Sequence, residues 1–151
     1  MVNAFRCSGR KVHMTTGIDW KVLQDKAIEV SRNAYAPYSK FPVGAAALAD
    51  DGRIVTGCNV ENVSYGLGLC AECSVVCALH STGGGRLVAL ACVAADGELL
   101  MPCGRCRQVL YEHGGPEMLI AHPGGPKRLA ELLPDAFGPD DLARVDGGQN
   151  Q

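Results

Sequence analysis

The chain has 151 residues, of which 47% are hydrophobic and 20% charged, and its formal net charge is −2. This length suits one domain that can bury roughly 68–70% of its unfolded surface, so the core needs no disulfides. No apolar run approaches the roughly 20 residues of a membrane-spanning helix, so no membrane association is expected. The basic residues are scattered, which argues against a nucleic-acid polymer as partner. The eight cysteines therefore indicate a reducing, cytoplasmic compartment and not a secreted disulfide framework.

The two ends of the chain lack the periodicity of folded elements. Residues 1–17 are basic and polar, and we expect a disordered extension that lacks the apolar stretch of a secretory signal. Met14 suggests that the first 13 residues come from start-codon choice or form a dispensable arm. We expect one domain over residues 18–142 and a flexible tail over residues 143–151.

Helices and strands alternate through the middle of the chain. Asp19 can cap a helix whose apolar residues recur at helical spacing, and Asp50-Asp51-Gly52 predicts a turn between antiparallel strands. The run Leu87 to Ala94 is almost continuously apolar, as in a central strand covered on both faces. The predicted elements are a helix from Asp19 to Tyr35, strands at Val43 to Ala49 and Ile54 to Cys58, a helix from Cys70 to His80, a strand at Leu87 to Ala94, a helix from Cys103 to His113, a strand at Glu117 to Ala121 and a short helix within Lys127 to Leu133.

This order predicts an α/β fold with a mixed sheet, parallel members and helices on both faces. In such folds a site forms at the carboxyl ends of the strands, where helices begin. Two of the predicted helices begin at cysteine motifs, so the sequence places a functional site there.

The two motifs are Cys70-Ala71-Glu72 and Pro102-Cys103-Gly104-Arg105-Cys106. Three thiolates leave the fourth position of a tetrahedral zinc ion open for water, as in a catalytic site. A nearby carboxylate, Glu72, would carry protons. A ligand, one residue, a Glu that does not bind the metal, and then Pro-Cys-x-x-Cys are the known signature of zinc nucleobase deaminases.

Cys73 leaves a structural alternative open. It creates a second Cys-x-x-Cys pair, and four thiolates would close the site. The stretch between the pairs, Ser74 to Pro102, is longer than the roughly 15–20 residues of the usual four-cysteine pattern and contains a predicted strand. This spacing favours the open, catalytic site.

Other residues that can bind metals receive structural interpretations. His80, His113 and His122 fall at the ends of predicted helices or strands, where capping or exposure is expected. Cys77 and Cys92 lie in apolar runs and are predicted to be core residues.

With these motifs in order, the chain resembles the small homotetrameric cytidine deaminases of pyrimidine salvage, over roughly Asp19 to Leu142. The motifs together are far more specific than any one alone. The matching pieces are Tyr35-Ala36-Pro37-Tyr38-Ser39, Phe41-Pro42-Val43-Gly44-Ala45-Ala46, Gly57-Cys58-Asn59-Val60-Glu61-Asn62, Cys70-Ala71-Glu72, Pro102-Cys103-Gly104-Arg105-Cys106-Arg107-Gln108, and Leu132-Leu133-Pro134 to Phe137-Gly138-Pro139.

The resemblance implies a three-layer α/β/α sandwich with a five-stranded mixed sheet and a homotetramer with active sites at subunit interfaces. It implies one Zn²⁺ per subunit, with cytidine and 2′-deoxycytidine converted to uridine and 2′-deoxyuridine plus ammonia. By matched position, the residues that it implies are the zinc ligands Cys70, Cys103 and Cys106, the catalytic acid and base Glu72, the ribose-binding Asn59 and Glu61, Tyr65 in the same loop, Phe41 packed on the nucleoside, and Phe137 stacked on the base from a neighbouring subunit.

One position departs from the family pattern. Cys73 replaces an Arg that, in many relatives, is thought to offset the excess charge of three thiolates on Zn²⁺. Arg105, Arg107 and the helix dipoles are the candidate compensators. We interpret Cys73 as a neighbour of the ligands that could donate a weak S–H bond to one of them, and not as a ligand itself.

Two other function classes remain open at this stage. A zinc module without enzymatic activity would need four sulfur ligands. A deaminase of another small molecule, such as a cytosine-bearing antibiotic, would share the zinc site but differ at the ribose-binding residues Asn59 and Glu61.

Overall fold

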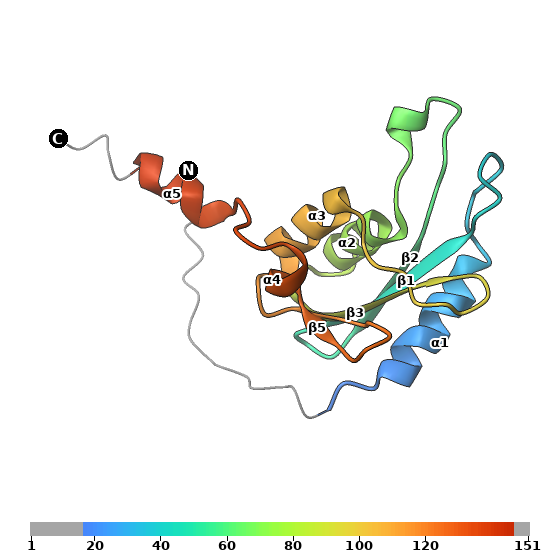
Figure 1. Ribbon diagram of the computed structural model, residues 1–151, viewed down its shortest axis with the longest axis horizontal. Coiled ribbons are helices and arrows are strands. Elements are labelled where there is room, and N and C mark those ends of the chain that lie inside the picture. Colours follow the sequence, from blue (N-terminus) through green and yellow to red (C-terminus); the bar gives the residue numbers. More distant parts are fainter. Residues whose placement is uncertain (1–16, 147–151) are drawn as a thin grey trace.

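The computed structural model describes residues 17–146, which form a five-stranded sheet with helices on both faces (Figure 1). This confirms the predicted three-layer α/β fold. In chain order the elements are α1 (Trp20–Ser31), β1 (Val43–Ala49), β2 (Ile54–Cys58), the 3₁₀ helix η1 (Tyr65–Leu67), α2 (Ala71–Ser81), β3 (Leu87–Ala94), α3 (Gly104–Gly114), β4 (Leu119–Ile120), β5 (Lys127–Arg128), α4 (Leu129–Leu132) and α5 (Pro139–Asp146). Within residues 17–146 no helix has the length and apolar character to cross a membrane.

The sheet is mixed, with strand order β2-β1-β3-β4-β5. β1 pairs antiparallel with both β2 and β3, while β3 pairs parallel with β4. β2, β3 and β4 therefore point in the same direction. Since α2 follows β2 and α3 follows β3, both helices begin beyond the carboxyl ends of parallel strands, as the order of elements predicts.

Side chains of β1 and β3 alternate between the two faces of the sheet and pack into two separate hydrophobic cores. Ala45 and Leu90 join Val75, Leu79 and other side chains in the core under α2 and α3. The neighbouring strand residues face α1, where Leu23 and Ala27 pack against small side chains of the sheet. Buried alanines on β1 let helix and sheet approach closely, because they add little side-chain bulk between the layers.

α1 is shorter than predicted. Its start is confirmed, because the Asp19 side chain accepts a hydrogen bond from the Val22 nitrogen at 3.0 Å. Its end at Ser31, and not at Tyr35, is a correction. The Tyr35 nitrogen donates to the Asn59 oxygen at 3.0 Å, so the chain leaves the helix to join the segment after β2. The helical spacing of apolar residues continues past Ser31 to Ala34, so the sequence pattern alone does not reveal the pairing of Tyr35 with Asn59.

The strand predicted over Glu117 to Ala121 contracts to Leu119–Ile120, which pair with Ala89 and Leu90 of β3 on one side and with β5 on the other. The helix predicted from Lys127 begins two residues later, because Lys127 and Arg128 form the fifth strand against β4. The backbone nitrogen of Arg128 donates to Glu131 Oε2 at 2.8 Å, which caps the start of α4.

The ends of the chain fall largely outside the description. The proposed extension lies outside it except for Gly17, and residues 147–151 of the proposed tail lie outside it too. Residues 143–146 belong to α5.

Replacing Gly57 with Ala tests how closely β2 approaches α2. A Cβ at this position would lie 2.6 Å from the Val75 nitrogen and 2.7 Å from the Ala71 oxygen. Because both are backbone atoms, we expect the free energy of unfolding to fall by about 1–3 kcal/mol, as measured by urea denaturation. Gly66→Ala is the matched control, since a Cβ there meets nothing within 4 Å, and its effect should stay within about 0.5 kcal/mol. Equal losses in the two variants would contradict the argument.

Candidate metal centre and active site

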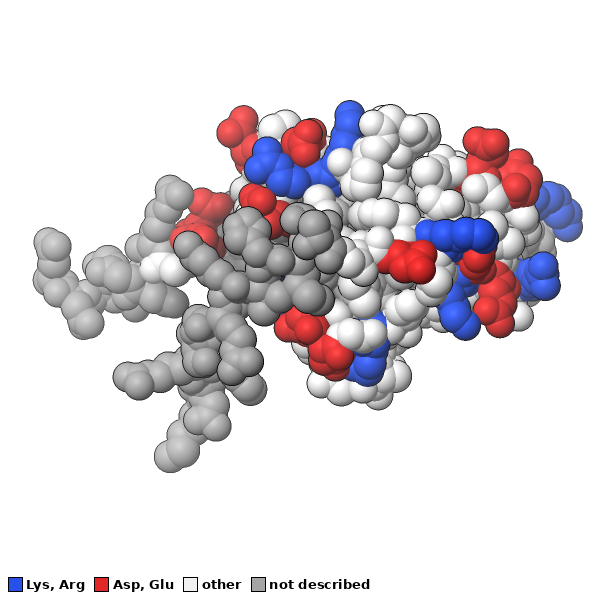
Figure 2. All heavy atoms as spheres, turned by 90° about the horizontal axis from the view of Figure 1, so that it is seen from below, with Lys and Arg blue, Asp and Glu red and all other residues white. Residues whose placement is uncertain are grey.

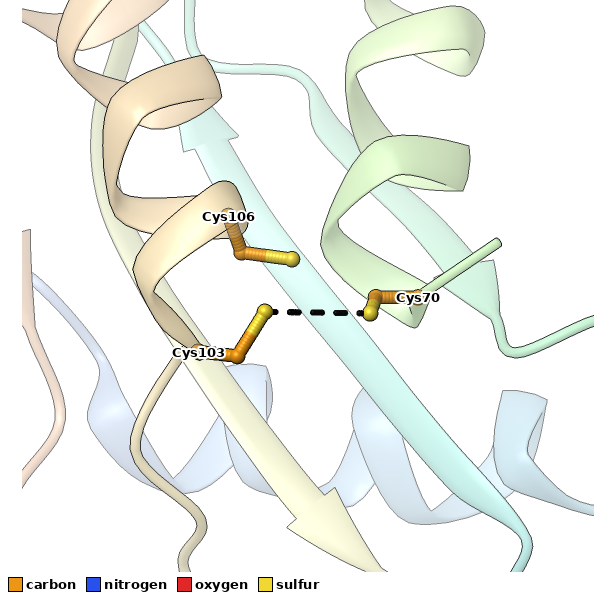
Figure 3. Close-up of side chains that lie close together, drawn as sticks. All are labelled: Cys70, Cys103 and Cys106. Carbon is orange, nitrogen blue, oxygen red and sulfur yellow. Dashed lines mark hydrogen bonds between the residues drawn. The ribbon is translucent and has the colours of Figure 1, made fainter. Parts of the chain in front are cut away.

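Two helix N-termini meet at the cysteine motifs. Cys70 is the N-cap residue of α2 and Cys103 that of α3, while Cys106 lies in the first turn of α3. Figure 3 shows the two helices rising side by side from the three thiols, with the side chains pointing toward one another. Helix N-termini favour negative charge, so this arrangement suits thiolates.

The spacing of the thiols fits a zinc ion. The three sulfur atoms lie within 4.8 Å of one another, and Cys70 Sγ is 4.0 Å from Cys103 Sγ (Figure 3). Zn–S bonds of about 2.3 Å in tetrahedral geometry place sulfur atoms about 3.8 Å apart. Three residues from two motifs far apart in sequence thus form a cluster that could hold a metal ion and leave its fourth corner free.

The protein environment affects the three thiols differently. Burial raises the pKa of Cys70 and, more strongly, that of Cys106, with the nearby Glu72 as a further cause for both. Hydrogen bonding from the backbone at the start of α3, with Cys106 the first cause, lowers the pKa of Cys103. Zinc binding needs all three as thiolates, so it releases protons and its affinity should increase with pH.

Glu72 lies beside the thiols and is almost fully buried, with 4% of its surface exposed. Its Oε2 accepts a hydrogen bond from Cys106 Sγ at 3.3 Å. A carboxylate in the first turn of α2 is also favoured by the helix dipole. The geometry therefore places a buried carboxylate, the group predicted to carry protons, in direct contact with the thiol cluster.

Cys92 lines the same cavity as Cys70 and Glu72, whereas Cys77 lines neither cavity. Cys92, on β3, is buried as predicted, and burial followed by the charge of Glu72 raises its pKa. Cys77 is exposed on α2, so its prediction as a core residue is wrong. No residue within 17–146 covers Cys77 on this face of α2.

Cys73 does not belong to the metal cluster found among residues 17–146. Its sulfur accepts a contact from Arg105 Nη2 at 3.6 Å, and the same nitrogen donates to the Gly68 oxygen at 3.2 Å. Arg105 therefore brings positive charge to the edge of the thiol centre through Cys73. This contact differs from the anticipated S–H bond from Cys73 to a ligand.

Arg107, the other candidate compensator, is engaged elsewhere. Its Nε donates to the Pro102 oxygen at 2.8 Å and its Nη1 to the Leu132 oxygen at 2.7 Å. These bonds fix the loop before α3 and tie it to the C-terminal end of α4. Arg107 thus has a structural role that the sequence did not indicate.

A cavity of about 390 Å³ opens above the thiols and Glu72. Its walls include Asn59, Glu61 and Tyr65, so the predicted substrate loop faces the metal cluster. This volume falls within the roughly 300–1,000 Å³ of ligand pockets. A second cavity of about 340 Å³ is lined by Tyr38, Ser39, Glu61 and Tyr65, among others.

Hydrogen bonds hold the polar residues of the substrate loop in place. Asn59 Oδ1 accepts from the Val43 nitrogen at 2.8 Å, and Asn59 Nδ2 donates to the Phe41 oxygen at 3.0 Å. Glu61 Oε2 accepts from the backbone nitrogens of Tyr38 at 2.9 Å and Ser39 at 3.2 Å. Asn59 therefore shapes the segment that carries Phe41, and Glu61 is oriented by the Tyr38-Ser39 turn.

Ser39 is a residue whose role sequence reasoning missed. Hydrogen bonding from its side chain is the first cause that lowers the pKa of Glu61, and its Oγ also accepts from the Phe41 nitrogen at 3.1 Å. The signal available in the sequence was only its place in the Tyr35 to Ser39 motif, which does not reveal a partner 22 residues away.

The remaining aromatic candidates are exposed. Phe41 has 51% of its surface exposed, Tyr65 80% and Phe137 61%. Tyr65 still lines both cavities, and its ring lies 6.0 Å from that of Tyr38. Phe137 is not among the residues that line either cavity, although the Gln108 side chain of α3 donates to its backbone oxygen at 2.8 Å. Within this chain, Phe137 is held in place but does not reach the site.

The cluster predicts different outcomes for two cysteine replacements. Cys106→Ser should reduce bound zinc from about one ion per chain to almost none, because a buried ligand is lost. Cys73→Ser, its matched control, should keep the ion, because Cys73 lies outside the cluster. Metal analysis of the purified proteins by mass spectrometry measures both. Loss of zinc from Cys73→Ser would show that the centre has four sulfur ligands.

Comparisons with known proteins agree with this geometry. A family model described as "Cytidine and deoxycytidylate deaminase zinc-binding region" matches residues 19–122. The chain is 72% identical to a cytidine deaminase of Mycobacterium tuberculosis over 127 residues, which covers 84% of this chain and 96% of that protein.

Solved structures give the same result. The crystal structure of the Mycobacterium tuberculosis cytidine deaminase matches with a TM-score of 0.80 and 71% identity, covering 81% of this chain and 99% of that one. A cytidine deaminase from Burkholderia pseudomallei matches with a TM-score of 0.71 and 38% identity, over 80% of this chain and 100% of that chain. The chain therefore belongs to the cytidine and deoxycytidylate deaminase family, whose zinc-binding region contains the three thiols.

Proposed function

We propose that the protein hydrolyses the C4 amino group of cytidine and 2′-deoxycytidine, releasing ammonia and leaving uridine or 2′-deoxyuridine. The observation that carries this proposal is the buried Glu72 in contact with a three-thiol cluster under a nucleoside-sized cavity. Family membership and relatives named cytidine deaminases support it. A role in pyrimidine salvage follows from these substrates.

The residues divide the chemistry between them. Cys70, Cys103 and Cys106 hold the zinc ion, which when bound supplies a Lewis acid that makes water a nucleophile near neutral pH. Glu72 accepts a proton from the water that adds to C4 and delivers it to the ring nitrogen N3. It then helps to protonate the departing amine, so one water is consumed and one ammonia released.

The walls of the cavity orient the nucleoside. Glu61, already fixed by two backbone nitrogens, keeps lone pairs for a ribose hydroxyl, and Asn59 stands beside it on the same strip. Tyr65 closes the side of the cavity, and Phe41, which lines neither cavity but is held through its backbone oxygen by Asn59, packs on the nucleoside. Asn59 and Glu61 are placed to bind a ribose. They therefore favour nucleosides over other small cytosine-bearing molecules, such as antibiotics.

A non-enzymatic zinc module is the other class of function. The position of Cys73 outside the thiol cluster argues against it, because a closed structural site needs a fourth ligand. Burying the Glu72 carboxylate costs free energy, and a structural zinc module has no use for this carboxylate that would offset the cost.

We further propose a homotetramer in which Phe137 reaches the active site of a neighbouring subunit. Phe137 is exposed and held by Gln108 outside the cavities of its own chain. Large apolar side chains around the site are also exposed: Val63 at 77%, Tyr65 at 80% and Leu67 at 66%. An apolar surface of this kind beside a cavity marks an interaction site, and a second copy would cover it.

A cytoplasmic location fits these thiols. The seven cysteines within residues 17–146 are all free. A zinc centre made of thiolates needs a reducing compartment, where disulfides do not form.

The surface charges do not favour a nucleic-acid polymer as substrate. On the face shown in Figure 2, Lys and Arg lie among Asp and Glu and do not form a continuous basic patch.

Glu72→Gln tests the function directly. The amide keeps the shape of the side chain but cannot accept the water proton, so kcat for cytidine should fall at least 100-fold, within the usual range of about 10²–10⁴ for acid–base catalysis. Loss of ultraviolet absorbance by cytidine measures the rate, and zinc content should stay at one ion per chain. Unchanged turnover by Glu72→Gln, or no turnover by the unaltered protein on either nucleoside, would refute the proposal.

Mixed oligomers test the donation of Phe137. Glu72→Gln and Phe137→Ala subunits should each be impaired alone, because each lacks one part of every site. After joint refolding, a subunit with Phe137→Ala keeps its own Glu72 and can receive Phe137 from its neighbour, so activity should rise above the average of the two proteins. Activity equal to that average would place Phe137 in its own subunit's site.

A further inference from the structure

The C-terminal ends of α2 and α3 bring together two imidazoles that the proposed reaction does not use. His80 Nε2 lies 3.1 Å from His113 Nδ1. The rings are edge to face, with centroids 4.8 Å apart and planes at 69°. His80 is exposed and His113 is half-buried, so the pair can be reached from solvent.

The separation of the two nitrogens suits chelation of one ion. Bonds of about 2.0–2.1 Å from a zinc-sized ion to two nitrogens at this separation make an angle of about 98° at the metal. This angle lies between the ideal tetrahedral and octahedral values. The nitrogens share one proton in their hydrogen bond, and that proton would move to the far nitrogen of its own ring when a metal takes its place.

The helix dipoles at this end favour a cation, whereas burial and the neighbouring His80 and Arg86 disfavour positive charge on His113. Each helix carries roughly half a negative charge at its C-terminus, and α2 and α3 end side by side. Burial, and then the neighbouring His80, lowers the pKa of His113, which keeps its imidazole in the neutral form that binds metals. Among the charged groups near His113, Glu112 raises its pKa, whereas His80 and Arg86 lower it.

From this geometry we propose that His80 and His113 form a second metal site, which binds a divalent transition-metal ion such as Zn²⁺ or Ni²⁺. Imidazole nitrogen suits these ions, whereas Mg²⁺ and Ca²⁺ prefer oxygen. Water completes the coordination, because only two side chains contribute. The ion would bridge α2 and α3 at the opposite end from the three thiols, and this site is independent of the proposed deaminase activity.

Calorimetric titration of the zinc-loaded full chain with NiCl₂ tests the site. We expect one Ni²⁺ equivalent per chain in addition to the resident zinc, with affinity at least tenfold lower in His80→Asn and in His113→Asn. His122→Asn is the matched control, because the His122 Nδ1 accepts from the Gly124 nitrogen at another place in the fold. It should bind Ni²⁺ like the unaltered protein.

Thermal unfolding provides a second readout. Ni²⁺ that binds only the folded state should raise the Tm of the unaltered protein and of His122→Asn, but not that of either pair variant. Binding should also weaken as the pH falls, because protonated imidazoles cannot ligate. Equal Ni²⁺ affinity in the unaltered protein and both pair variants, or loss of binding only in His122→Asn, would overturn the proposal. Cytidine turnover by the folded pair variants need not change.

Discussion

The convergence of the α2 and α3 N-termini on one point is the constraint on which the site depends. Each helix follows a strand of the same direction, so both begin at the same edge of the sheet. Their dipoles and first-turn backbone nitrogens favour the charge that three thiolates and a carboxylate would bring together. Because Cys70 and Cys103 are themselves the N-cap residues, the positions of two of the three clustered thiols are set by where the helices begin.

Three thiolates on one Zn²⁺ ion would carry excess negative charge, and the residue directly after Glu72 is Cys73 and not a cation. Arg105 contacts Cys73, which lies one residue after Glu72, and the Gly68 oxygen of the substrate loop. Its charge therefore acts at the rim of the cavity, where solvent screens it more than it would at a buried position. The N-termini of α2 and α3 add partial positive charge next to the thiols themselves.

Local patterns predicted the elements that carry the site, and tertiary pairing explains where they failed. β1, β2 and β3 matched their predicted bounds, because apolar runs between clear turn signals specify strands well. The end of α1 and the short β4 and β5 depended on backbone partners distant in sequence, such as Tyr35 with Asn59. No local pattern encodes such pairings.

The same reasoning explains which parts of the site were predictable. The thiols and Glu72 stand in motifs whose chemistry requires those residue types. The orienting role of Ser39, the carbonyl contacts of Arg107 and the exposure of Cys77 depend on how distant segments pack. The pairing of His80 with His113 arises likewise only because two helices of similar length start at one metal centre and run in parallel.

α3 links the metal centre to the aromatic side chain that we assign to a neighbouring site. Its first turn carries Cys103 and Cys106, and the next residues, Arg107 and Gln108, bind the backbone of the segment from Leu132 to Phe137. Any shift of α3 that accompanies metal binding must therefore move the support of Phe137. In the proposed tetramer, metal binding in one subunit would then influence how well Phe137 stacks on the cytosine ring of the nucleoside bound in the adjacent subunit. Such coupling needs no long pathway, since one helix contacts both elements.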